Sequence, residues 1–254
     1  PSHPVFGTAC TSSFDCDIKF TKVASASSFS CALTTEGDVS IITLNDGKAN
    51  VFTPEMSSTV SNLLDQVPGD KGSLIITGRP GIFSAWFDLK IISSGDTDAV
   101  ATMVKAGFTL LARIYNFPRP VIAACSGHGV ALGAFLLCCA DYRLGAKGQF
   151  IVQANETRNN MSIPTPILEI SKSRISKTHW YRAILNAEAY PVEKAIEPGY
   201  LDEVTEPDNL MIRAMEVAND LATLGHPHYK LTKDLDQKET LKRIHDAIGK
   251  VASL

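Results

Sequence analysis

The residues with the clearest chemical potential form a short glycine turn between two apolar runs. Ser126-Gly127-His128-Gly129 separates the β-branched run 121–125 from the helix-forming run 132–140. This pattern predicts a buried strand, a turn and a buried helix. Glycine lets another molecule approach the backbone, and the first N–H groups of the following helix lack partners and favour negative charge. The stretch therefore suggests a pocket for a developing oxyanion, although an ordinary buried strand-turn-helix has the same pattern.

The same stretch also has the length of a membrane span. Residues 121–140 form a run of 20 residues without a charged side chain, which is enough to cross a bilayer. The glycine turn and the change from β-branched to helix-forming residues favour two buried elements instead. We therefore expect no membrane partner.

A second candidate for chemistry is the carboxylate of Glu156. It is the only acid in the polar segment 153–160 (QANETRNN), which follows a predicted strand at 148–152. A positioned carboxylate can take a proton from a reacting group and return it. An ordinary solvated loop acid is the alternative interpretation.

The elements that must position these groups follow a strand-helix-strand order. Residues 38–44 and 73–77 read as strands, and a helix is expected between them from Pro54 to about residue 67, capped by Thr53. Strand, helix and strand at this spacing predict a right-handed crossover and parallel pairing. The loop 78–90 then follows a buried strand, at the edge where ligands bind in α/β folds.

A helix over 97–117, apolar at positions 100, 104, 108, 111 and 114, leads into the glycine stretch. Two similar units thus stand about 47 residues apart, at Ile75 and Ile122. Beyond residue 165 the chain reads as mostly helical. We expect an N-terminal extension over 1–35, an α/β core over 36–190 and a C-terminal helical region over 191–254.

Composition restricts the partners and the compartment. The chain has 24 basic and 27 acidic residues, a net charge of -3 that suggests no nucleic-acid partner. The six cysteines form no CxxC pair and have no metal-ligand spacing with the six histidines. We expect no metal site and free thiols in a reducing compartment, the cytoplasm or an organellar matrix, for a protein that is not secreted.

Four segments together resemble the crotonase (enoyl-CoA hydratase/isomerase) superfamily. They are 41–51 (IITLNDGKANV), 82–90 (IFSAWFDLK), the glycine stretch 120–142, and 187–204, and the resemblance covers roughly residues 36 to 250. It implies an α/β fold built as a spiral of ββα units, with C-terminal helices that form a homotrimer or a hexamer. It also implies an acyl-CoA thioester as substrate, so that coenzyme A belongs to the substrate and no separate cofactor is needed.

In this family two backbone N–H groups hold the thioester oxygen, and the resemblance assigns them to Phe87 and Leu132. Ala85 is placed to offer its carbonyl to the adenine amine. Lys48 and Lys90 are candidate partners of the CoA phosphates, or ordinary solvated lysines. His128 lies near the expected pocket mouth and could contact the ligand or be a structural loop histidine.

The chain departs from the family pattern at two positions. Trp86 stands where the loop normally has glycine, which could narrow the pocket. Phe135 stands where hydratases carry the first of two catalytic glutamates. Glu156 is then the candidate for the second, with Asn155 beside it in the pocket wall, as in the branch of Δ3,Δ2-enoyl-CoA isomerases.

One carboxylate instead of two changes the expected reaction. Hydration needs one group to activate water and another to deliver or share a proton, whereas moving a double bond from C3 to C2 needs one base that returns its proton at C4. We therefore expect an isomerase that converts 3-enoyl-CoA to 2-trans-enoyl-CoA through Glu156. The alternatives are another crotonase reaction (hydration, thioester hydrolysis or decarboxylation) or a catalytically silent acyl-CoA-binding protein.

Overall fold

The computed structural model of the 254-residue chain describes residues 31–85 and 87–251. Within them, the larger sheet has six strands in the order β1-β2-β3-β5-β7-β10. They are β1 (Ala32–Glu36), β2 (Val39–Thr43), β3 (Ser73–Thr77), β5 (Val121–Cys125), β7 (Tyr142–Ala146) and β10 (Glu203–Thr205). From β2 to β10 the neighbours are parallel, and every residue of β3 and β5 is buried.

The register of this sheet confirms the predicted pair of units. Ile75 of β3 lies directly opposite Ile122 of β5 in a parallel ladder. Both strands are short apolar runs, which is typical of strands that are covered on both faces. The spacing of about 47 residues in the sequence is therefore the length of one repeating unit, from β3 to its neighbour β5.

A second sheet of four strands has the order β4-β6-β8-β9. Its strands are β4 (Gly81–Ala85), β6 (Gly127–Val130), β8 (Ile151–Gln153) and β9 (Tyr190–Pro191), and β4, β6 and β8 are parallel. Because β3, β5 and β7 each continue into a strand of this second sheet, the chain advances as a spiral. This is the expected crotonase-type fold class.

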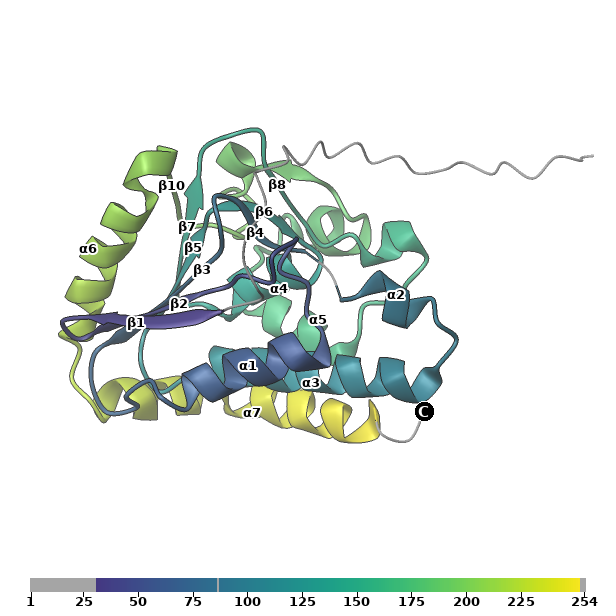
Figure 1. Cartoon of the computed structure of the whole chain (residues 1–254), viewed down its shortest axis with the longest axis horizontal. Helices are drawn as coiled ribbons and strands as arrows, with labels where there is room; N and C mark the ends of the chain where they lie inside the picture. The colour runs from purple at the N-terminus through teal and green to yellow at the C-terminus, as the bar shows by residue number, and fades with distance from the viewer. Residues whose placement is uncertain (1–30, 86, 252–254) are drawn as a thin grey trace, which may run out of the picture.

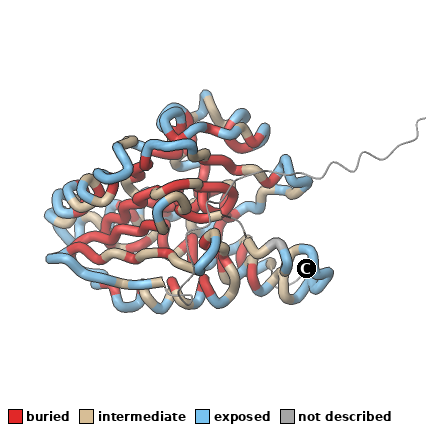
Figure 2. The backbone as a smooth tube through the Cα atoms, turned by 45° about the horizontal axis from the view of Figure 1, so that its top comes forward, coloured by how far each residue is buried: buried red, intermediate tan, exposed pale blue. Residues whose placement is uncertain are grey.

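Helices cover both faces of the larger sheet (Figure 1). α6 packs on one face, over the apolar cluster that includes Ile75, Ile122 and Ala214. The other helices enclose the larger core, in which the strands are buried and the outer helical faces are exposed (Figure 2). The helices are α1 (Pro54–Leu64), α2 (Leu89–Ile92), α3 (Thr97–Tyr115), α4 (Leu132–Cys139), α5 (Thr165–Lys172), α6 (Leu210–Ala222) and α7 (His228–Lys250), with short helical turns η1 (Glu156–Asn159), η2 (Tyr181–Leu185), η3 (Val192–Lys194) and η4 (Pro207–Asn209).

The start of α1 and the first strand differ in how well the sequence predicts them. Thr53 caps α1 as expected, since its Oγ1 accepts a hydrogen bond from Met56 N at 3.0 Å. β1, in contrast, lies within the region that the sequence places outside the core. It pairs in antiparallel fashion with β2, so the ordered fold begins before residue 36. The first 30 residues of the extension expected over 1–35 lie outside the described residues.

The last helix, α7, is tied to the core by buried polar contacts. Lys233 Nζ lies 2.7 Å from Asp141 Oδ2, and the same oxygen accepts a hydrogen bond from Val121 N at 2.9 Å. Gln237 Nε2 donates to the Tyr115 carbonyl of α3 at 3.0 Å. This hydrogen bond attaches α7 to α3, and α7 lies beneath α3 in the view of Figure 1.

Two further features concern membrane spans and cysteines. Among the helices of residues 31–85 and 87–251, none combines the length and apolar character that a membrane span requires. The four cysteines in these residues carry free thiols, three of them fully buried.

Candidate active site

An apolar cavity of about 150 Å³ lies where α3, the start of α4, η1 and α5 meet. Glu156 and Ser162 are the polar side chains in its wall. The remaining lining residues are apolar: Phe87, Ile92, Val100, Val104, Phe108, Ala131, Leu132, Met161, Pro164 and Ile167. Phe108 and Ile167 are buried, whereas Ser162 and Pro164 are exposed. The cavity can take an apolar chain with one ionisable group beside it.

The pairing of β4 with β6 brings Phe87 and Leu132 to this cavity together. Ala85 at the end of β4 lies opposite Val130 at the end of β6 in the parallel ladder. Phe87 and Leu132 each follow two residues later, so both emerge at the same edge of the sheet. Both line the cavity, as the assignment of the two N–H donors requires.

The backbone at the start of α4 is turned into an unusual conformation. Ala131 has a φ of 51° and a ψ of -117°, outside the regions that residues other than glycine normally adopt. Its N–H donates to the Gln153 carbonyl at 2.7 Å, which holds the turn. Leu132 is the first residue of α4, so its own N–H has no acceptor within the helix. That N–H is available to a ligand oxygen.

Close packing between α4 and β4 fixes the spacing of the two loops. A Cβ atom on Gly133 would lie 2.1 Å from the Ser84 carbonyl oxygen, so only glycine allows this approach. Ser84 Oγ in turn donates to the Asn50 carbonyl at 2.9 Å, and Asn50 Nδ2 donates to the Phe83 carbonyl at 2.9 Å. The asparagine loop that follows β2 therefore braces β4 from the other side.

Asp46 holds this asparagine loop in shape. Its carboxylate accepts hydrogen bonds from the N–H groups of Lys48, Asn50 and Val51, at 2.7 Å, 2.8 Å and 2.8 Å. Asn50 has a φ of 53° and is fully buried. The sequence pattern identified the loop, but the bracing roles of Asp46 and Asn50 depend on contacts that only the fold reveals.

Glu156 begins the short turn η1, directly after β8, and lines the cavity with 7% of its surface exposed. Its Oε2 is buried and has no hydrogen-bond partner among the described residues. Loss of hydration on burial disfavours the charged form and raises the pKa of this carboxyl to about 7. Among the described residues that line the cavity, it is the only titratable one. It can therefore both accept and return a proton near neutral pH.

Phe135 lies one turn further into α4 and is completely buried in the core. It does not line the cavity. An aromatic ring therefore occupies the position that the resemblance reserves for the first hydratase glutamate.

The structure places the other expected site residues away from the cavity wall. His128 Nδ1 accepts a hydrogen bond from Ile151 N at 3.2 Å, its ring packs edge-on against Phe150, and burial lowers its pKa. Asn155 precedes Glu156 and has a buried Oδ1 without a partner among the described residues. Neither His128 nor Asn155 lines the cavity.

The residues expected to contact coenzyme A do not line the cavity. Ala85 is half-buried, and its N–H donates to the Ala49 carbonyl at 3.0 Å. Lys48 and Lys90 are exposed. Trp86 lies outside the described residues. Within the described residues, no cluster of three or more His, Cys, Asp or Glu side chains is arranged to hold a metal ion.

Several lining residues were not singled out as site residues by the sequence, among them Val100, Val104, Phe108, Met161 and Ile167. The first three recur every four residues along α3, a spacing that predicts a helix face turned to the core. This spacing predicts which face of α3 is buried, but a packed core and a cavity wall produce the same spacing.

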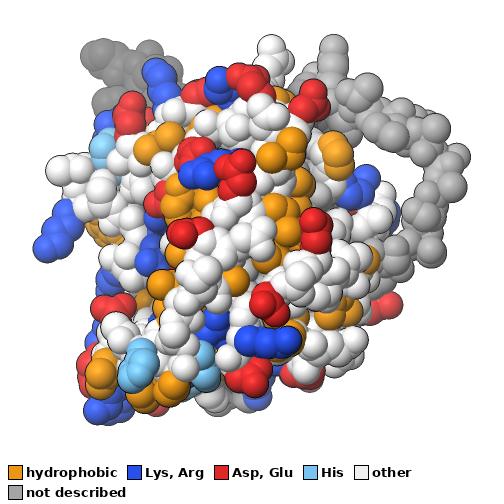
Figure 3. Space-filling model, turned by 90° about the vertical axis from the view of Figure 1, so that its left-hand side faces the viewer, with side chains coloured by type: hydrophobic (Ala, Val, Ile, Leu, Met, Phe, Trp, Pro, Cys, Tyr) orange, Lys and Arg blue, Asp and Glu red, His pale blue; other side chains and the backbone are white. Residues whose placement is uncertain are grey.

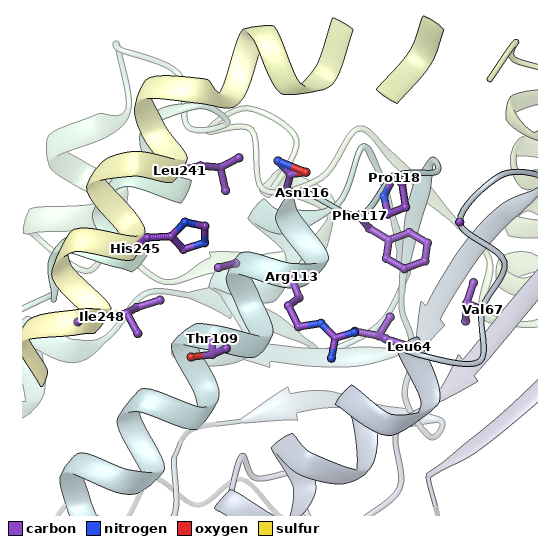
Figure 4. A pocket seen from close by; sticks show the side chains of 13 residues that line it. Leu64, Val67, Thr109, Arg113, Asn116, Phe117, Pro118, Leu241, His245 and Ile248 are labelled. Carbon is purple, nitrogen blue, oxygen red and sulfur yellow. The ribbon is translucent and has the colours of Figure 1, made fainter. Parts of the chain in front are cut away.

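A larger cavity of about 670 Å³ lies elsewhere, between α1, α3 and α7 (Figure 4). The Arg113 side chain of α3 points toward Leu64, and Leu241, His245 and Ile248 line the cavity from α7. Arg113 is already engaged by Ser61 and Asp65 of the α1 region. No carboxylate lines this cavity among the described residues, and it shares none of its lining with the smaller one. The smaller cavity is therefore the candidate active site.

The fold and this arrangement agree with comparisons to known proteins. Residues 34–248 match the family model described as enoyl-CoA hydratase/isomerase, and the chain belongs to this family. A protein named enoyl-CoA delta isomerase 2, peroxisomal, from Arabidopsis thaliana is 27% identical over 181 residues, which cover 68% of this chain and 75% of the relative.

Solved structures show the same relationship. An enoyl-CoA hydratase/isomerase family protein from Pseudomonas syringae superposes with a TM-score of 0.84 at 35% identity, covering 88% of this chain and 96% of that one. An enoyl-CoA isomerase from Mycobacterium tuberculosis superposes with a TM-score of 0.81 at 33% identity, covering 88% and 97%. The chain is thus an enzyme of the enoyl-CoA hydratase/isomerase type.

Proposed function

We propose that this enzyme isomerises 3-enoyl-CoA to 2-trans-enoyl-CoA, with Glu156 as its single base. The observation that carries the proposal is the isolation of Glu156. It is a buried carboxyl with a pKa of about 7 in an apolar cavity, and no second titratable side chain among the described residues lines that cavity.

In this mechanism the thioester oxygen lies between the N–H groups of Phe87 and Leu132. The Glu156 carboxylate removes a proton from C2, and the electron pair of that C–H bond forms the enolate. The negative charge on the oxygen is stabilised by the two N–H donors, each worth several kcal/mol, with about 3 kcal/mol lost when one is removed. Protonated Glu156 then gives the proton to C4, and the double bond moves to C2.

The raised pKa of Glu156 suits both halves of this cycle. A carboxylate with a pKa near 4.5 would be a weaker base towards C2, and its acid form would be scarce at neutral pH. The apolar wall also keeps water away from the enolate, which disfavours hydration. The printed name of the Arabidopsis protein supports the same reaction, whereas the mycobacterial protein is named an isomerase in one solved structure and a probable enoyl-CoA hydratase in another.

An ultraviolet assay tests the proposal, because the product is conjugated and the substrate is not. We expect purified protein to conjugate 3-hexenoyl-CoA and Glu156→Gln to lose at least about a hundredfold in kcat, the lower range for general acid-base catalysis. Glu169→Gln is a matched control, since Glu169 is equally buried but pairs with Lys172 and Arg243 outside the cavity. Wild-type activity in Glu156→Gln would sink the assignment, and a screen of product masses would identify hydration, hydrolysis or decarboxylation.

We also propose that coenzyme A lies outside the mouth of the small cavity. Lys48 and Lys90 would then be near its phosphates, and the Ala85 carbonyl near its adenine. Lys48 and Lys90 are exposed; Lys48 lies in the asparagine loop that braces β4, and Lys90 lies in α2, shortly after Phe87. Replacing both by Ala should raise KM for acyl-CoA and leave kcat nearly unchanged.

A homotrimer or hexamer is proposed for the assembly. On the α6 side, hydrophobic side chains gather among charged ones (Figure 3). Four large hydrophobic side chains of α6, α7 and the connection between them are at least 40% exposed: Ile212, Leu224, Leu231 and Leu235. Light scattering that gives the mass of a monomer would contradict this proposal.

A further inference from the structure

Gly107 occupies an unusual position for a glycine. It lies in the interior of α3, where glycine is less favourable than alanine, and it is buried. A Cβ atom at this position would lie 2.5 Å from Cε1 and 2.9 Å from Cζ of Phe87. The Phe87 ring therefore fills the space that any larger residue at position 107 would need.

The surroundings of the Phe87 ring limit where it can move. Phe108 packs against it edge-on, with ring centroids 5.8 Å apart and planes at 69°. Leu132 lies on the same side, its Cδ2 only 3.7 Å from the Cβ position of Gly107. Phe87, Phe108 and Leu132 all line the small cavity, whereas Gly107 does not. A ring displaced from the helix therefore moves into the cavity.

We propose that Gly107 is a positioning residue for acyl-chain length, because it lets the Phe87 ring lie back against α3 and leaves the cavity open. The proposal rests on the proposed function in that it takes the small cavity as the acyl site. Carbon atoms in contact lie about 3.5–4.0 Å apart, so a methyl group at position 107 would push the ring tip inward by about 1 Å. Such a shift removes room for about one methylene group.

The volume of the cavity sets the substrate class. An apolar cavity of 150 Å³ holds a molecule of about the size of benzene, which has six carbons. The acyl group that fits is therefore short, of about six carbons. Each methylene that leaves apolar contact lowers affinity by about fourfold.

Binding of saturated acyl-CoAs tests this without turnover. Isothermal titration with butanoyl-, hexanoyl- and octanoyl-CoA gives a ratio of hexanoyl to butanoyl affinity for each variant. We expect Gly107→Ala to lower this ratio about fourfold or more. Phe87→Ala should extend binding to octanoyl-CoA, and adding Gly107→Ala to it should change nothing further, since the methyl group then meets no atom closer than Leu132 Cδ2.

Two further variants keep the proposal falsifiable. Gly249→Ala is the matched control, because Gly249 is a helical glycine in α7 and a Cβ added there meets nothing within 4 Å. The ratio of hexanoyl-CoA to butanoyl-CoA affinity in this variant should equal that of the wild type. Should Gly107→Ala fail to fold, Phe87→Leu takes its place, because removing the ring tip while keeping Gly107 should improve octanoyl-CoA binding.

The outcomes separate this proposal from the proposed function. The role of Gly107 would be overturned if Gly107→Ala left the ratio of hexanoyl-CoA to butanoyl-CoA affinity unchanged. It would also be overturned if Gly107→Ala changed this ratio equally with and without the Phe87 ring. A wild-type protein that binds these acyl-CoAs with the expected ratios but does not convert 3-hexenoyl-CoA would remove the isomerase function and leave the role of Gly107 supported.

Discussion

At the scale of single residues, the chemistry depends on the surroundings of Glu156 rather than on its sequence position. The carboxyl is 7% exposed, its Oε2 has no partner in the described part of the chain, and burial raises its pKa to about 7. The sequence singled out Glu156 as the only acid of its segment. It left the burial of Glu156 undecided, because part of the cavity wall comes from α3, which is distant in the chain.

The raised pKa predicts the pH dependence of activity. The base must be ionised to remove the C2 proton, so kcat/KM should rise about tenfold per pH unit below a pH of about 7 and level off above it. Initial rates with 3-hexenoyl-CoA from pH 5 to 9 measure this. A profile that is already flat from pH 5 would contradict the assignment of Glu156 as the base.

The same pKa predicts a gain in stability for Glu156→Gln at high pH. The folded pKa lies above the ordinary 4.5, so wild-type stability is lost as pH rises from about 4.5 through about 7. Since one pKa unit corresponds to about 1.4 kcal/mol, the full difference approaches about 3 kcal/mol. Thermal melts should place Glu156→Gln several degrees above the wild type at pH 8 but not at pH 4.5. A constant difference across this range would refute the shift.

At the scale of elements, the site depends on the register of two short strands. Ala85 of β4 pairs with Val130 of β6, which places Phe87 beside Leu132. The sequence predicted β2, β3 and β5 of the larger sheet, because short apolar runs are a clear signal. It missed β4 and β6, since glycine and polar residues interrupt the alternation and the strands are held by neighbours distant in the chain.

Gly133 is expected to control this register. A methyl group there would meet the Ser84 carbonyl oxygen at 2.1 Å, and a backbone atom cannot move as a side chain can. Gly133→Ala should lower kcat by about a hundredfold through loss of one aligned donor and destabilise the fold by about 1–3 kcal/mol. Steady-state kinetics and urea unfolding measure both. Gly225→Ala, where an added Cβ meets nothing within 4 Å, should behave as the wild type.

At the scale of the whole molecule, the C-terminal helices hold the cavity walls in place. α7 packs along α3 and α5, which supply Phe108 and Ile167 to the cavity. The sequence predicted a helical C-terminal region, but the buried contact between Lys233 and Asp141 joins residues 92 positions apart. No local pattern could indicate such a pair.

Breaking this contact should loosen α7. Lys233→Met keeps the apolar stem, but it removes the lysine partner of Asp141, which is largely buried. Removing one member of a buried ion pair costs about 3 kcal/mol. Lys230→Met, which breaks an i,i+4 pair with Asp234, should cost less than about 1 kcal/mol. Urea unfolding compares the two, and equal costs would contradict this role of Lys233.

The central claim is that one carboxyl carries a proton from C2 to C4 inside an apolar cavity. Its most direct test uses 3-hexenoyl-CoA with deuterium at C2, converted in ordinary water and analysed by mass spectrometry and NMR. Single-base transfer by Glu156 predicts that a substantial share of the product carries deuterium at C4 and that Glu156→Gln forms no product. Product that carries only solvent hydrogen at C4, formed at the same rate by Glu156→Gln, would contradict the claim.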